Sequence, residues 1–87
     1  GNYPNPFNPR TTIVFELARP GAVELRVYDV SGRLVRTLQA GERFTAGRHE
    51  VVWNGRDERG AATAAGVYFV RMRSGDFTAV ERMTLVK

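Results

Sequence analysis

The stretch from Val51 to Arg73 constrains the fold more than any other part of the chain. Val51 and Trp53 take alternate positions before a polar, glycine-bearing loop, and Tyr68 and Val70 do so after it. A period of two is that of a β-strand, so this stretch predicts two strands joined by a long turn. Trp53 is the single tryptophan. We expect it in the core because its ring covers a large apolar area, and a ligand-stacking platform is the alternative.

The same period of two recurs along the rest of the chain, and no segment shows a helical period. Ile13, Phe15 and Leu17 share one strand face, for example. Strands are predicted over 11–17, 23–28, 34–38, 49–54, 67–73 and 78–86, with glycine or proline in the turns. About six or seven short strands at this spacing are typical of an antiparallel β-sandwich, which is the fold class we predict.

Residues 34–47 give a less regular pattern. Leu34 and Leu38 favour one inward face of the strand, whereas Val35 favours the other, so both assignments stay open. We expect residues 39–47 to form a connection in which Phe44 closes one end of the core.

The N-terminal segment, residues 1–10, is rich in proline and asparagine. Its three prolines exclude a helix and favour an extended or turning path. Tyr3 and Phe7 are unusual in a polar linker, so we expect both rings to pack on the edge of the domain. The 87 residues suit one domain, and we predict a single domain over 1–87 that includes this segment.

Composition excludes several classes of protein. The net charge is +4, but the basic residues are scattered among the acidic ones, so no nucleic-acid partner is expected. No apolar run approaches the roughly 20 residues that span a bilayer, so no membrane insertion is expected. There is no cysteine and hence no disulfide. The chain opens without Met, and we interpret it as part of a longer protein whose export signal lies upstream.

Residues with chemical potential are few. Asn54, Asp57 and Glu58 place oxygen atoms near a glycine and give a weak calcium hypothesis, although a calcium site needs about six oxygens. Asn and Asp side chains also cap turns, which is the simpler interpretation. The single histidine, His49, has no nucleophile and acid placed around it by the sequence. We therefore expect no metal, no cofactor and no enzymatic activity.

Carbohydrate binding is a competing hypothesis, because sandwich modules of this size use surface aromatics as platforms. Tyr28, Trp53, Tyr68 and Phe69 are the candidates. No predicted strand carries a row of outward aromatics, however, and Tyr68 shares its face with apolar residues, which indicates core.

Several motifs, specific only when taken together, carry a resemblance to a known family. They are Pro4-Asn5-Pro6-Phe7, Tyr28-Asp29 to Gly32-Arg33, Trp53-Asn54-Gly55 to Gly60, Gly66-Val67-Tyr68, and a basic, apolar tail ending at Lys87. From Asn2 to Lys87 the chain resembles the C-terminal sorting domain (type A) of type IX secretion substrates. It is similar also to the related Ig-like domain of the flagellar hook-capping protein.

The resemblance implies a seven-stranded Ig-like β-sandwich that acts as a sorting signal. Such a domain ends an exported cargo protein, is recognised by outer-membrane secretion and sortase components, and is often cleaved as the cargo reaches the cell surface or medium. Its partners are then that machinery and the N-terminal cargo domains of its own chain. By match to the family's motifs, the recognition residues are Pro4, Asn5, Pro6, Gly66, Tyr68, Arg82, Leu85, Val86 and Lys87.

Two alternatives accompany this expectation. Gly66 can serve only a turn, and the last strand can serve only to complete a sheet; a free last strand would also permit an edge-paired dimer. The domain as a whole can instead be a structural or adhesive Ig-like module, like the hook cap or a cell- or carbohydrate-attachment module of a secreted enzyme.

Overall fold

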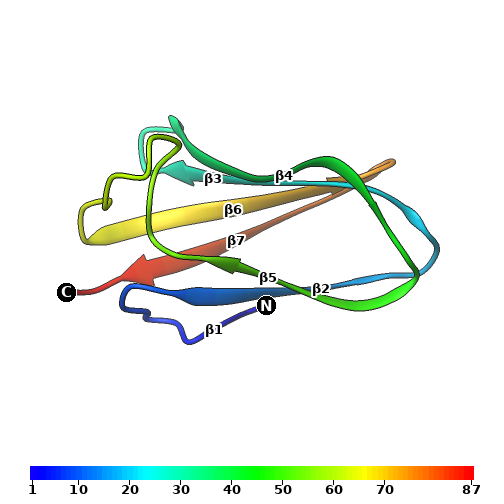
Figure 1. The fold of residues 1–87 in the computed structure, drawn as a ribbon, viewed down its shortest axis with the longest axis horizontal. Coiled ribbons are helices and arrows are strands. Elements are labelled where there is room, and N and C mark those ends of the chain that lie inside the picture. The colour runs from blue at the N-terminus through cyan, green and yellow to red at the C-terminus, as the bar shows by residue number, and fades with distance from the viewer.

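The computed structural model describes all residues from Gly1 to Lys87 and contains seven strands and no helix. Two antiparallel sheets face each other (Figure 1). The three-stranded sheet has the order β1-β2-β5 and the four-stranded sheet the order β4-β3-β6-β7. The strands are β1 (Asn2–Tyr3), β2 (Thr11–Leu17), β3 (Gly21–Asp29), β4 (Leu34–Phe44), β5 (Gly47–Trp53), β6 (Gly66–Ser74) and β7 (Phe77–Leu85).

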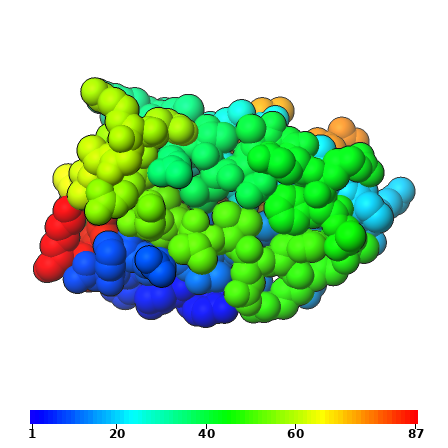
Figure 2. Space-filling view, viewed as in Figure 1, coloured from blue at the N-terminus to red at the C-terminus, as the bar shows by residue number.

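The predicted antiparallel β-sandwich is thus confirmed, with the Ig-like layering of two sheets. No helix is long and apolar enough to cross a bilayer. The N-terminal segment, blue, lies beside the C-terminal residues, red (Figure 2).

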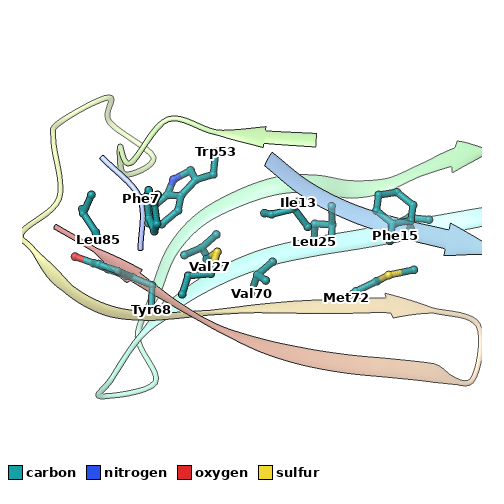
Figure 3. Close-up of a cluster of buried hydrophobic side chains, with 12 residues drawn as sticks. Phe7, Ile13, Phe15, Leu25, Val27, Trp53, Tyr68, Val70, Met72 and Leu85 are labelled. Atoms are coloured by element: carbon teal, nitrogen blue, oxygen red, sulfur yellow. The ribbon is translucent and has the colours of Figure 1, made fainter. Parts of the chain in front are cut away.

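The core lies between the sheets and is filled by the alternate residues of each strand (Figure 3). Trp53 is 0% exposed and is a core residue, as predicted. Its ring packs against Phe7 at 5.5 Å and Tyr68 at 5.3 Å between centroids, so three aromatic rings fill one end of the sandwich. The other buried apolar residues are Ile13, Phe15, Val23, Leu25, Val27, Val70, Met72, Met83 and Leu85.

Strand β4 differs from the sequence prediction. It runs for 11 residues to Phe44, so the expected connection over 39–47 is wrong for most of its length. In the pairing of β4 with β3, three residues of β4 have no partner: Val35, Leu38 and Gly41. The register shifts by one residue at each of them, as in a β-bulge, and regular pairing continues beyond it. Two such bulges explain why Val35 and Leu38, three positions apart, both pack on the core while Leu34 is exposed.

The two aromatic residues of the N-terminal segment, both expected on the edge of the domain, differ in burial. Phe7 is 1% exposed, within the core. Tyr3 is 51% exposed, so about half of its surface stays in contact with solvent. The reason is register: Tyr3 pairs with Thr12, on the outward face of the three-stranded sheet, and its hydroxyl donates a hydrogen bond to Glu50 instead.

Replacing Phe7 should therefore cost far more stability than replacing Tyr3. We expect Phe7→Ala to lower the free energy of unfolding by about 3–5 kcal/mol, because it leaves a cavity beside Trp53. Tyr3→Ala, in the same segment, should change it by about 0.5 kcal/mol or less, since the ring is exposed. Urea denaturation followed by Trp53 fluorescence measures both values. Equal losses would contradict the burial described here.

Candidate functional site

The two ends of the chain are joined by backbone hydrogen bonds at one end of the sandwich. The Phe7 N–H donates to the Thr84 carbonyl over 2.9 Å, and the Val86 N–H donates to the Phe7 carbonyl over 2.9 Å. These bonds pair Phe7 in parallel with Leu85. The N-terminal segment therefore acts as a short extra strand along the outer edge of β7.

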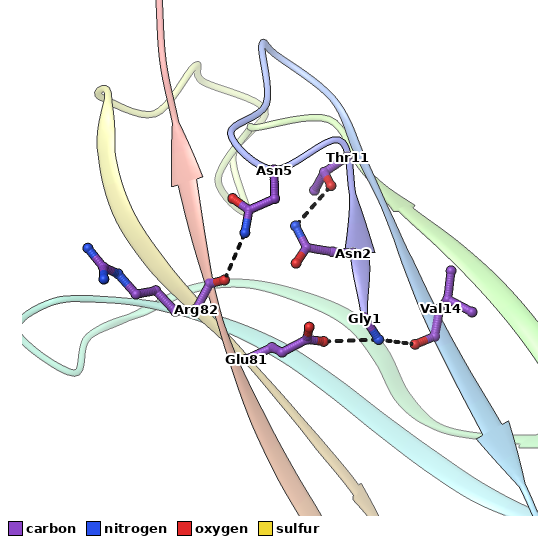
Figure 4. A network of polar contacts seen from close by, with 7 residues as sticks. All are labelled: Gly1, Asn2, Asn5, Thr11, Val14, Glu81 and Arg82. Carbon is purple, nitrogen blue, oxygen red and sulfur yellow. Dashed lines mark hydrogen bonds and ion pairs between the residues drawn. The ribbon is translucent and has the colours of Figure 1, made fainter.

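Asn5 extends this pairing with its side chain (Figure 4). Its Nδ2 donates to the Arg82 carbonyl at 3.3 Å, and its Oδ1 accepts from the Thr84 N–H at 2.9 Å. A carboxamide carries one donor and one acceptor side, so it replaces a peptide group of a neighbouring strand. The edge of β7 is thereby satisfied from Arg82 to Val86, so this part of the last strand is not a free edge.

Thr11 anchors the other side of the N-terminal segment. Its hydroxyl is fully buried and donates to the Pro4 carbonyl at 2.9 Å. The same oxygen accepts from Asn2 Nδ2 at 3.2 Å. Sequence reasoning missed this residue, because a threonine that opens a strand gives no signal beyond β propensity.

Gly55 fixes the long loop after β5 against the N-terminal segment. Its φ is +75°, and a Cβ at this position would lie 2.6 Å from the Pro9 carbonyl oxygen. Only glycine combines this backbone conformation with so close an approach. The loop is also held from inside, where the indole N–H of Trp53 donates to the Arg56 carbonyl over 3.0 Å.

The nine residues that the resemblance assigned to recognition fall into two groups. Tyr68 and Leu85 are 7% and 2% exposed, and Gly66 is half-buried opposite Leu85 at the start of β6. The Tyr68 hydroxyl donates to the Ala64 carbonyl at 2.6 Å. A partner reaches Tyr68 and Leu85 only by opening the core, whereas Gly66 has open space beside it.

The remaining six are exposed, and they lie around the joined chain ends. We call them the terminal surface: Pro4, Asn5, Pro6, Arg82, Val86 and Lys87. The prolines present rigid apolar rings, whereas Arg82 and Lys87 add positive charge without an acidic partner in the chain. This arrangement suits a partner that offers carboxylates beside an apolar face.

The weak calcium hypothesis receives no geometric support. Asn54 Oδ1 accepts from the Arg56 N–H at 3.1 Å, and Asp57 Oδ1 accepts from the amides of Arg59 and Ala61 at 2.9 and 3.0 Å. Glu58 accepts from the Thr37 N–H. The three side chains thus cap turns or neighbouring backbone, and no group of three acidic or histidine side chains gathers in the molecule.

The other candidate residues are also accounted for by packing. His49 Nε2 lies 2.7 Å from the Thr45 carbonyl, and its ring packs on Phe15 and Phe44. Trp53 is buried and cannot stack on a ligand. Tyr28 lies half-buried on the outer face of the four-stranded sheet, with the Arg71 guanidinium 4.9 Å from its ring centroid.

Comparison with known proteins identifies the family. The model of the FlgD Ig-like domain matches residues 6–76, more than half of the chain. The chain belongs to the FlgD Ig-like domain family. No curated protein matches it.

Two solved structures share the fold. One is PorZ, a surface component of the type IX secretion system of Porphyromonas gingivalis, with a TM-score of 0.72 and 24% identity over 100% of this chain. The other is FlgD from P. aeruginosa, with a TM-score of 0.68 and 23% identity over 86% of this chain. The match spans 11% of the PorZ chain and 58% of the FlgD chain, so the fold occurs within longer proteins.

The Asn5 contacts predict a measurable effect on β7. Asn5→Ala removes both bonds, and we expect it to lower the free energy of unfolding by about 1–3 kcal/mol. Hydrogen exchange at the Thr84 amide should accelerate at the same time. Asn8→Ala is the matched control, since Asn8 is also exposed and also precedes a proline but its side chain forms no hydrogen bond in the structure, and it should change neither value. Equal effects of the two substitutions would contradict the role given to Asn5.

Hydrogen bonds in the β3–β4 turn lead us to predict a lowered pKa for Asp29. The pKa of Asp29 lies below its ordinary value of 3.8, because the Ser31 hydroxyl and the Arg33 and Ser31 amides hydrogen-bond the carboxylate. Because the pKa is lowered on folding, this stabilisation is complete above the unfolded-state value and is lost as pH falls through the folded-state value.

We therefore expect the carboxyl carbon of Asp29 to titrate below pH 3.8 in NMR, and Ser31→Ala to raise that midpoint. Ser74→Ala, on another strand, should leave it unchanged. An Asp29 midpoint that does not respond to Ser31→Ala would be inconsistent with the hydroxyl as the main cause.

Proposed function

We propose that this domain is a non-catalytic sorting signal, which the type IX secretion machinery binds through the terminal surface. The observation that supports it most is the meeting of the chain ends: residues near positions 5 and 85 form one exposed surface. The fold shared with PorZ agrees with this proposal. The domain then directs an attached cargo from the periplasm to the cell surface or medium.

Binding rests on shape and charge in this proposal. Arg82 and Lys87 attract an acidic partner, and Pro4 and Pro6 supply a rigid apolar contact that loses little conformational entropy. The outer edge of β7 is occupied by Asn5 and Phe7 from Arg82 onward, so addition of a partner strand at this end would displace the N-terminal segment. Docking on side chains is therefore favoured over strand addition at this end.

A structural or adhesive Ig-like module is the second candidate function. The family match to the FlgD Ig-like domain favours it, because that family does not by itself specify secretion. The two candidates differ in what the terminal surface does: a sorting signal needs its exposed charges, whereas a structural module needs only its folded core.

A localisation assay separates the two candidates. Gly1–Lys87 is fused to the C-terminus of a periplasmic reporter in a bacterium with a type IX system, and reporter at the surface and in the medium is measured. We expect export, and we expect Arg82→Ser with Lys87→Ser to reduce it at least about tenfold, as loss of about 1.4 kcal/mol of binding would. Removal of residues 82–87 is unsuitable, since it also removes buried Met83 and Leu85.

Arg19→Ser with Arg43→Ser is the matched control, because it removes the same charge from exposed residues in the β2–β3 turn and near the end of β4. The β2–β3 turn lies at the end of the sandwich opposite the C-terminus (Figure 1). This control should leave export unchanged, and circular dichroism should show all variants folded. A folded wild-type domain that leaves the reporter in the periplasm would favour the structural module. Export that is insensitive to Arg82 and Lys87 would exclude the terminal surface as the recognition site.

A further inference from the structure

Half of the inner face of β7 is uncovered. Strand alternation places Phe77, Ala79 and Glu81 on the same face as Met83 and Leu85. Met83 and Leu85 are 0% and 2% exposed, yet Phe77 is 57% exposed. The inner face of β7 is buried near Leu85 and exposed near Phe77, so the opposite sheet covers only part of the length of β7.

The layer that stops short is the three-stranded sheet. β1 contains only Asn2 and Tyr3, and it pairs with the first part of β2. Figure 1 shows the N-terminus partway along the sandwich rather than at its end. Beyond that point a groove of about 200 Å³ opens between β2 and β7. It is mainly apolar, and its lining includes Phe15, Leu25, Val70, Met72, Phe77 and Val80.

The backbone along this groove is arranged for another strand. Gly1 and Val14 exchange two bonds, from the Gly1 amine to the Val14 carbonyl at 3.0 Å and from the Val14 N–H to the Gly1 carbonyl at 2.7 Å. In an antiparallel ladder the next outward N–H and C=O belong to the residue two positions on, which is Glu16. At Glu16, the edge of β2 on the side of β1 faces no strand of this chain. An apolar groove beside an unpaired edge fits an extended peptide.

We propose that the groove is the seat of the segment joined to the amino end of Gly1 when the domain is carried in a longer chain, and that this segment prolongs β1 along β2. The register is set by the Gly1–Val14 pair. The first and third residues before Gly1 would lie opposite Phe15 and Leu17 and point inward, where the groove favours apolar side chains. The second residue lies opposite Glu16, exchanges hydrogen bonds with its backbone and points outward.

Continuity favours this occupant over a second copy of the domain. The preceding residues enter in line with β1, at the register that the ladder already has, whereas a second copy would have to bring a strand end beside Gly1. The Gly1 amine also forms an ion pair with Glu81 at 3.1 Å (Figure 4). Joining a residue to Gly1 removes that charge, but the Glu81 side chain is 45% exposed and such a pair contributes little.

Two extended proteins of the same composition test the proposal. One carries Thr-Val-Thr-Val directly before Gly1, which places valine at the first and third positions; the control carries Val-Thr-Val-Thr, which places valine outward. We expect the first to have a folding equilibrium constant at least about tenfold higher than the control, because two valine side chains cover the groove. Hydrogen exchange at the Glu16 amide should slow in the first protein alone.

A third measurement addresses Phe77 directly. Phe77→Ser should cost more stability in the first extended protein than in the 87-residue chain, where the ring is exposed. Equal stability of the two extended proteins, or equally fast exchange at Glu16, would overturn the proposal. Sedimentation that shows the 87-residue chain as a dimer with Phe77 protected would overturn it too, because the occupant would then be a second copy.

Discussion

The packing of Phe7 against Trp53 is the contact on which the two ends of this domain depend. Phe7 lies on a segment with little regular structure, yet it is 1% exposed and completes an aromatic cluster between the sheets. Its backbone is thereby held beside β7, where the Asn5 side chain also pairs with the strand edge. One buried ring thus couples a proline-rich segment, both sheets and the last strand, and the terminal surface exists because of it.

Much of the fold was predictable because alternation on short strands is a strong signal. The inward residues of β2 and β3 and the burial of Trp53 follow from a period of two. That reasoning failed in β4, where the ladder skips Val35, Leu38 and Gly41. A bulge shifts the period by one residue, and a strand that contains several resembles an irregular loop in sequence. The strand was therefore predicted to end six residues too early, at Leu38 rather than Phe44.

The site was less predictable than the fold, and the reason is sequence separation. The Asn5 side chain forms hydrogen bonds with Arg82 and Thr84, which are 77 and 79 positions away in the sequence. No local pattern distinguishes Asn5 from Asn8. The family resemblance selected residues at both ends of the chain, but it did not separate exposed from buried ones. The structure makes that division: Tyr68 and Leu85 serve the core, while Arg82, Val86 and Lys87 face outward.

The division into exposed and buried residues determines what a partner of the terminal surface would need in order to bind: the folded domain. The terminal surface combines residues from the first six and last six positions, and they are neighbours only when the sandwich is folded. A receptor that binds this surface consequently distinguishes a folded domain from an unfolded tail of the same sequence. Under the proposed function, the stability of the aromatic cluster would limit recognition directly, because opening the core at Phe7 separates the two halves of the surface. Core substitutions and surface substitutions are therefore expected to impair recognition by different routes, the first through the folded population and the second through affinity.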